Sequence, residues 1–181
     1  MNDGLIPQRY AKALYKLALD KKNTGQVYEE MKQVVTSFEN ASELQKVMTN
    51  PFVGRDRKEA LLISAAGDKL EDDYRNFVRL VLSHNREEYA YRMALEYRRL
   101  YREENQIAQV VISTAAALPE AEMEKIRDVV RKAFPGYTLE FVSKVNPDLI
   151  GGFVVDVNST RMDASISNEL EQLRLKLLSS N

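Results

Sequence analysis

The chain has 181 residues, with 44% hydrophobic and 29% charged side chains, and its formal net charge of −1 argues against a nucleic-acid partner held by bulk electrostatics. The absence of cysteine and the single histidine, His84, exclude disulfides, thiolate or multi-histidine metal sites and cysteine nucleophiles. With no apolar run near the roughly 18 residues of a membrane helix and no signal-peptide core at the N-terminus, we expect a cytosolic bacterial protein.

Helical periodicity dominates residues 1 to about 105. Pro7 is expected in the first turn of the first helix, and Gly25 is expected to separate that helix from the second. Ser42 and Gln45 have the spacing of a capping box and open a short third helix, which ends at Asn50-Pro51 because the residue before proline avoids helical geometry.

Three further helices complete this region. Asp56 and Glu59 form a box-like start for the fourth helix over 60–66, which Gly67 closes. The fifth begins in the acidic group 71–73, where carboxylates favour the positive end of the helix dipole. The sixth covers about 87–104. Six helices with short connections predict a compact antiparallel bundle.

The pattern changes at Ile107, where a β-branched run over 107–113 predicts a strand. A helix opens at 118–120 and ends at Pro135-Gly136, and its expected inward positions are Met123, Ile126, Val129, Val130 and Ala133. Alternation over 137–145 predicts a half-buried strand, with Tyr137, Leu139, Phe141 and Val145 on its apolar side.

An apolar strand over 153–157 comes next. Asn158-Ser159 is expected to turn it into a short return strand through Arg161 and Met162. The chain then closes with an amphipathic helix whose apolar positions are Ile166, Leu170, Leu173 and Leu177. We therefore predict an α+β fold, with a six-helix antiparallel bundle over 1–105 and a small α/β domain of β-α-β-β order plus a closing helix over 106–181.

Candidate chemical sites are weak throughout the chain. His84 is expected to be a helix-dipole partner or simply exposed. Gly151-Gly152 precedes a strand and lacks the spacing of a phosphate loop, so a bend or bulge is favoured. Asp148, Asp156 and Asp163 do not have calcium-loop spacing, and Asp163 is expected to cap the last helix. The sequence thus predicts no catalytic residue, no metal and no cofactor.

The first and fifth helices carry more apolar surface than one narrow stripe requires. Tyr10, Ala13, Leu14 and Leu17 spread over the first helix, and the run 77–82 is similarly broad on the fifth. Such a helix is either deeply buried or presents a second face to a partner, and the sequence leaves both alternatives open.

Several motifs occur together in order. They are the R-Y-A-x-A-L pattern over 9–14, Asn50-Pro51, Asn76-Phe77 followed by Asn85-Arg86, and Pro147 to Gly152 with Asp163 and Ser165. In this order and spacing they resemble the delta subunit of F-type ATP synthases, called the oligomycin-sensitivity-conferring protein in mitochondria.

The resemblance implies a structural connector without catalytic residues, in a complex that makes ATP from a proton gradient. The first domain is then expected to bind the N-terminal helix of an alpha subunit, and the second the b subunits of the peripheral stalk. The implied groove residues are Tyr10, Ala13, Leu14, Leu17, Phe77, Leu80 and Val81. The implied location is peripheral, on the cytoplasmic face of the bacterial plasma membrane, as one copy in a hetero-oligomer.

Two other functions are compatible with parts of the sequence. The β-α-β-β end offers a sheet face to RNA, but the neutral charge and the lack of paired aromatics on the strands oppose it. An enzymatic function would have few catalytic groups to use, since the sequence has one histidine, no cysteine and no recognisable nucleotide-binding loop.

Overall fold

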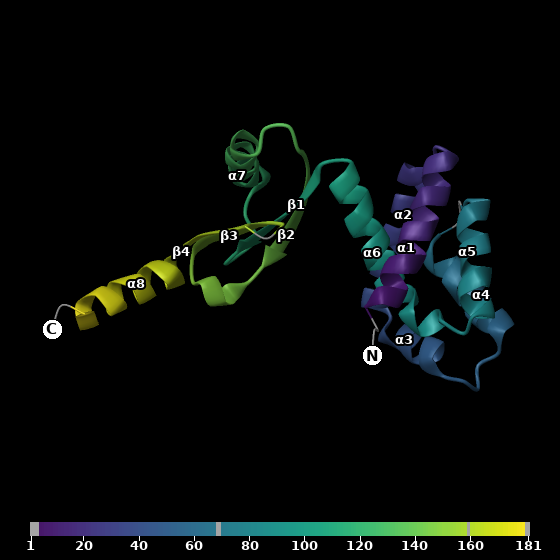
Figure 1. The fold of residues 1–181 in the computed structure, drawn as a ribbon. Helices are drawn as coiled ribbons and strands as arrows, with labels where there is room; N and C mark the ends of the chain where they lie inside the picture. The colour runs from purple at the N-terminus through teal and green to yellow at the C-terminus, as the bar shows by residue number, and fades with distance from the viewer. Residues whose placement is uncertain (1–3, 68–69, 159, 180–181) are drawn as a thin grey trace. The chain divides into compact units, whose positions relative to one another are not determined.

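A computed structural model describes residues 4–67, 70–158 and 160–179 of the chain. The protein is α+β and divides into two compact units, Met1–Glu104 and Asn105–Asn181, as Figure 1 shows. Each unit has its own hydrophobic core.

The first unit is helical. Its elements are α1 (Leu5–Asp20), α2 (Thr24–Asn40), α3 (Ser42–Thr49), α4 (Arg55–Ala65), α5 (Asp72–Ser83), the 3-10 turn η1 (Glu87–Tyr89) and α6 (Ala90–Glu104). Its core is built around α2 and α6, where Met31, Val35 and Tyr97 are almost fully buried. The Tyr97 hydroxyl stays satisfied by donating to the Thr24 carbonyl at 3.2 Å.

Some helix starts differ from those predicted. Gly25 does not break the chain: it is the second residue of α2, and the turn lies earlier, at Lys22, whose φ is 59°. A Cβ at Gly25 would lie 3.3 Å from the Tyr101 hydroxyl, so the glycine allows close packing of α2 on α6.

The predicted capping boxes do not form. In α3 the cap residue is Ala41, and the Gln45 side chain instead donates to the Glu88 carbonyl at 3.1 Å. In α4 the cap is Gly54, while Glu59 accepts from Arg79 at 3.1 Å. Gln45 and Glu59 therefore bond to residues of other elements and not to the helix ends that their spacing predicted.

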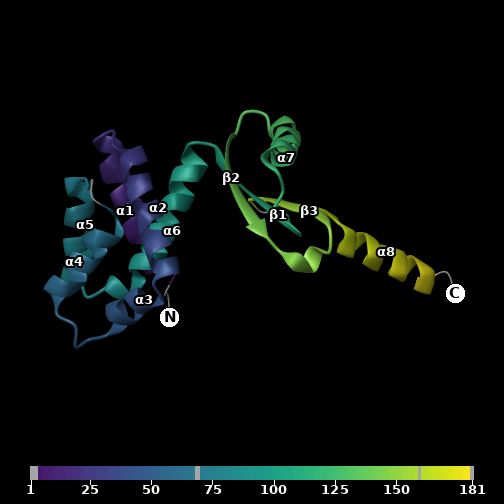
Figure 2. The ribbon, with the colours of Figure 1, turned by 180° about the vertical axis from the view of Figure 1, so that it is seen from behind.

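The second unit contains β1 (Ile107–Thr114), α7 (Glu120–Ala133), β2 (Thr138–Val145), the 3-10 turn η2 (Pro147–Leu149), β3 (Gly152–Val157), β4 (Thr160–Ser165) and α8 (Ile166–Ser179). The sheet order is β2-β1-β3-β4, with β1 parallel to β2 and the other pairs antiparallel. Helix α7 connects the parallel pair and packs on the sheet through Met123, Ile126 and Val130 (Figure 2).

Several side chains expected to be buried are exposed. Val129 and Ala133 of α7 face solvent, because only positions 123, 126 and 130 fall on the stripe that meets the sheet. Tyr137 and Val145 are also exposed, since β2 is an edge strand and only Leu139 and Phe141 reach the core.

The turn predicted at Asn158-Ser159 is described only in part. Asn158 has φ 51°, and Ser159 lies outside the described residues. The side chain of Leu177, predicted for the apolar stripe of the last helix, also lies outside the described set.

Candidate partner-binding groove

An open groove of about 330 Å³ lies along α1 and α5. It is lined by Arg9, Tyr10, Ala13, Leu14, Leu17, Asp73, Asn76, Phe77 and Leu80. Spacings of three and four residues place these side chains on one face of each helix. The floor is apolar, and the polar groups stand at its margins.

Contacts near both ends of α1 hold the walls in antiparallel order. Near the start of α1, the Tyr10 hydroxyl and His84 Nδ1 are 2.7 Å apart, and the Tyr10 ring meets the edge of Phe77 with centroids 6.4 Å apart. Near its end, Lys21 Nζ donates to Asp73. Because the start of α1 is tied to the end of α5, the two helices run in opposite directions along the groove.

Most of the predicted groove residues are found in this surface. Leu17 is 40% exposed and Leu80 is 46% exposed, which is unusual for leucines that sit beside a hydrophobic core. Leu14 is buried and forms part of the floor. The structure therefore brings together six of the seven residues that the resemblance implied, without showing what covers them.

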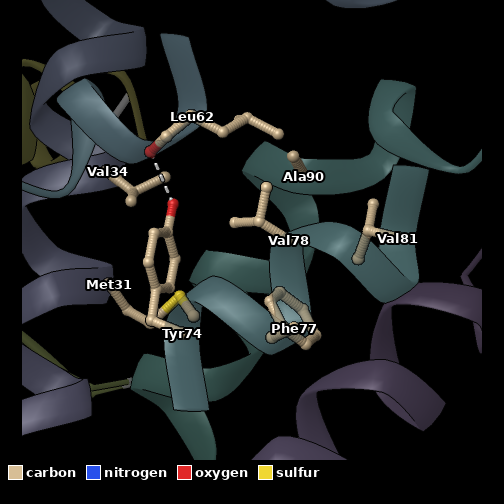
Figure 3. A pocket seen from close by; sticks show the side chains of 8 residues that line it. All are labelled: Met31, Val34, Leu62, Tyr74, Phe77, Val78, Val81 and Ala90. Carbon is tan, nitrogen blue, oxygen red and sulfur yellow. Dashed lines mark hydrogen bonds between the residues drawn. The ribbon is translucent and has the colours of Figure 1, made fainter. Parts of the chain in front are cut away.

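Val81 is the residue that the structure places elsewhere. It is 1% exposed and lines a small core cavity of about 10 Å³ with Val78 and Tyr74. In Figure 3 Val78 lies between Tyr74 and Val81, Val81 lies on the Ala90 side of the cavity, and the Tyr74 hydroxyl donates to the Leu62 carbonyl at 2.8 Å. Position 81 follows Leu80 by 100° around the helix, which turns it from the groove into the core.

Asp73 lies at one margin of the groove and is almost completely buried. Burial acts to raise the pKa of its carboxyl group, but hydrogen bonds from Lys21 and from Asn23, at 2.9 Å, outweigh burial and lower the pKa. The same hydrogen bond raises the pKa of Lys21. This margin is therefore held by a charged pair across α1 and α5.

Glu30 of α2 supports the start of α5. Its Oε1 accepts from the Glu71 backbone N–H at 2.6 Å, and its Oε2 is buried without a hydrogen-bond partner among the described residues. Burial raises the pKa of Glu30 to about 7. A carboxyl group that titrates near neutral pH thus contacts the first turn of a groove helix.

Sequence reasoning missed part of this surface. The sequence pattern indicates Asp73 only as a helix-dipole carboxylate, and Arg9 and Asn76 only as motif residues. His84 is a dipole-end residue as expected, and it also bonds to Tyr10. The spacing of 73, 76, 77, 80 and 84 along one face of the fifth helix was the available signal.

A second apolar surface lies on α8. Leu170 is 53% exposed and Leu173 is 55% exposed, and Ile166 and Ile150 beside them are also exposed. The main contacts of the helix are with β4 and η2, and it extends away from the sheet in Figure 2. The predicted amphipathic stripe is therefore present but is not covered within the unit.

The signature motif forms the junction that starts α8. Pro147 opens η2, and the Gly151 carbonyl accepts from the Ile166 N–H at 3.1 Å. Asp163 is not the cap: it lies in β4 and accepts from the Ser165 hydroxyl at 2.6 Å. Ser165 Oγ in turn accepts from the Asn168 N–H at 3.3 Å, which is the geometry of an N-cap.

Asn50 and Pro51 act as predicted at the end of α3. Asn50 has extended backbone angles, and its side-chain oxygen accepts from the Phe52 N–H at 2.9 Å. The motif residues thus shape the backbone at two turns, one after α3 at Asn50-Pro51 and one before β3 at 147–152.

The family model for the ATP synthase delta (OSCP) subunit matches residues 6–177. The chain belongs to this family. It is 40% identical to ATP synthase subunit delta of Parabacteroides distasonis over 178 residues, covering 98% of each chain. It is 34% identical to the subunit delta of Phocaeicola vulgatus, covering 98% of this chain and 96% of that one.

A solved structure shares the fold of this delta-family chain. It is a cryo-EM structure titled Toxoplasma gondii mitochondrial ATP synthase hexamer, with a TM-score of 0.75 at 20% identity, covering 95% of this chain and 97% of that one. Delta-family proteins are structural, non-catalytic stalk subunits of F-type ATP synthase, which is a hetero-oligomeric, membrane-bound complex. Within the described ranges, no helix is long and apolar enough to cross a membrane.

Proposed function

We propose that the chain clamps the catalytic head of an F-type ATP synthase to its peripheral stalk, with one partner on each unit. The single observation that carries the proposal is the uncovered apolar groove along α1 and α5, in a chain of the delta family. Its occupant is the N-terminal helix of an alpha subunit, and the first unit serves as an antiparallel six-helix bundle that presents the groove.

The groove suits a helix rather than an extended strand. Its walls are α-helices, whose backbone groups pair within the helix except at the ends, so they offer side chains and no free strand edge. Ala13, an exposed small residue in the groove lining, lets a partner helix approach closely. Covering Leu17 and Leu80 would contribute part of the roughly 1.5–3 kcal/mol that full burial of each side chain provides.

The partner of the second unit is the C-terminal part of the stalk b subunits. The exposed stripe of α8 is the apolar surface that this interaction needs, because Ile166, Leu170 and Leu173 otherwise remain in water. A row of such side chains on one helix face is typical of a helix that packs against other helices.

A connector of this kind resists rotor torque by slow dissociation. Two separate attachments in one chain raise the effective concentration of each, so loss of one contact does not release the other. The chain would act as a single copy in the complex, peripheral to the membrane on its cytoplasmic face, without nucleic acid, metal or cofactor.

Calorimetry with the full chain tests the groove. The probe is a synthetic peptide of the N-terminal segment of the same organism's alpha subunit, and the variant is Leu80→Glu. We expect the variant to lose binding by at least about tenfold, because a carboxylate would be desolvated against Phe77.

The matched control is Leu95→Glu, which changes an exposed leucine of α6 that does not line the groove. It should bind like the wild type. Absence of binding by the wild-type chain, or equal losses in both variants, would refute the groove assignment.

A further inference from the structure

Glu30 is a carboxyl group buried at the junction of α2 and α5. It lies within α2 and is 3% exposed. Its Oε1 accepts from the backbone N–H of Glu71, which is the N-cap residue of α5. Its Oε2 is also buried and has no hydrogen-bond partner among the described residues. The side chain therefore joins α2 to the start of α5 through its bond to Glu71.

The charges that act on Glu30 are mostly negative. On α5, the carboxylates of Glu71 and Asp73 favour the protonated form of Glu30, and the guanidinium of Arg75 opposes them. Lys21, at the end of α1, pairs with Asp73. Its ammonium group is thus engaged by another carboxylate, and Arg75 is left as the cation that acts on Glu30.

Two buried phenols are the other titratable neighbours of Glu30. Tyr74 of α5 donates to the Leu62 carbonyl at 2.8 Å, and Tyr97 of α6 donates to the Thr24 carbonyl at 3.2 Å. Both hydroxyl hydrogens are used in these bonds, so neither phenol donates to Glu30. Burial raises the pKa of both phenols, and the charge of Glu30 adds to the effect.

Ionisation of Glu30 conflicts with its burial. A carboxylate accepts more strongly from the Glu71 N–H, but the loss of water around a buried charge outweighs this gain and raises the pKa of Glu30 to about 7. Water can return if the start of α5 moves away from α2. A helix end opens at lower cost than a helix middle, and Tyr74 in the next turn is anchored in the core.

We propose that Glu30 is a proton-binding site that controls the order of the first turn of α5. With the proton bound, the carboxyl group stays buried and holds the Glu71 N–H. When the proton leaves, the carboxylate takes up water and the first turn separates from α2. The rest of α5 stays in place through Tyr74.

Nuclear magnetic resonance of the full chain tests this switch. We expect the ¹³C signal of the Glu30 carboxyl to titrate near pH 7. The amides of Glu71 and Arg75 should lose protection from hydrogen exchange with the same midpoint. The Arg75 N–H donates to the Glu71 carbonyl at 3.4 Å, so it reports on the first bond of the helix.

Proton linkage gives the size of the effect. After correction for the intrinsic exchange rate, protection of these two amides should fall about tenfold between about pH 6 and about pH 8, because the opened state releases the proton more readily. Low concentrations of urea should leave this protection unchanged, since a local opening exposes little surface.

Three variants separate the proton from the fold. Glu30→Gln keeps an acceptor for the Glu71 N–H and has no proton to lose, so protection of both amides should not change with pH. Glu71→Gln keeps the N–H and removes a carboxylate, so Glu30 should titrate at lower pH. Glu29→Gln, an exposed neighbour on α2, is the control and should behave like the wild type.

Each part of the switch has its own contrary result. Titration of Glu30 near its ordinary value of 4.5 would overturn the proton-binding site. Titration near pH 7 with unchanged protection of Glu71 would overturn its control of α5. Because all of these measurements use the free chain, neither result depends on the partners named in the proposed function.

Discussion

Glu30 is the residue whose environment departs most from that of an ordinary surface carboxylate. It is 3% exposed on α2, and the groups that act on it are Glu71, Asp73 and Arg75 at the start of α5. The nearby phenols of Tyr74 and Tyr97, from α5 and α6, have raised pKa values, to which the charge of Glu30 contributes. Burial of Glu30 favours its neutral form in the folded chain and raises its pKa to about 7.

The sign of the resulting pH dependence follows from proton uptake. Between its ordinary pKa of 4.5 and its folded pKa of about 7, the folded protein holds a proton that the unfolded chain releases. Stability from this group is thus complete at low pH and declines as pH rises through that window. At about 1.4 kcal/mol per unit of pKa, the loss is on the order of 3 kcal/mol.

We expect Glu30→Gln to remove this decline, because the amide keeps the acceptor for the Glu71 N–H and carries no charge. Urea unfolding at about pH 5 and about pH 8 measures the effect. The wild type should be less stable relative to the variant at the higher pH.

Glu29→Gln is the control for Glu30. It changes an exposed glutamate on the same helix, whose side chain is 60% accessible and pairs with Lys32. An equal pH response in the wild type and in Glu30→Gln would show that Glu30 is already ionised throughout this range.

Among the elements, the junction of β3, β4 and α8 depends on two adjacent glycines for different reasons. A Cβ on Gly151 would lie 2.5 Å from Ile166 Cδ1, a flexible side-chain end. A Cβ on Gly152 would lie 2.2 Å from the Ala164 carbonyl oxygen, and Gly152 has φ 72°. Glycine is required more strictly at Gly152 than at Gly151, because the Ala164 backbone cannot move aside and a side chain is disfavoured at that φ.

We therefore expect Gly152→Ala to destabilise the chain by roughly 1–3 kcal/mol or more. The backbone clash would separate β3 from β4 at their first pair, Gly152 with Ser165. Thermal unfolding measures the loss. Gly4→Ala, at a position with φ −81° and open space around it, should leave stability nearly unchanged. Equal stability of both variants would contradict this account of the junction.

At the scale of the whole molecule, the two apolar surfaces belong to different units with separate cores. We expect a change in one unit to leave the other unit's binding unaltered, because each surface is built on its own core. The proposed connector function depends on this independence.

We predict that Leu173→Glu weakens binding of a peptide from the C-terminus of the b subunit by at least about tenfold, by placing charge in the buried part of the interface. The same variant should bind the alpha-subunit peptide like the wild type. Calorimetry with each peptide checks both statements.

Val129→Glu is the control, because Val129 is equally exposed in the same unit but lies on α7. Loss of b-peptide binding in this control as well would show that α8 is not the specific surface. Loss of alpha-peptide binding in Leu173→Glu would show that the units are coupled.

The sequence by itself determined the α+β class, the change of pattern at Ile107 and the membership suggested by the ordered motifs. Periodicity and proline or glycine breaks are local properties, so they locate helices and strands without knowledge of their neighbours. The over-wide apolar faces of the first and fifth helices also pointed to the groove, although burial remained an equal alternative.

Only the tertiary structure decided which of those alternatives holds for each side chain. Leu80 and Val81 are adjacent and similar, yet one faces the groove and the other the core. Gln45 and Glu59 do not take the predicted capping roles because they bond to Glu88 of η1 and to Arg79 of α5 instead. These outcomes depend on which helices pack together, and the side chains that determine the packing are far apart in the chain.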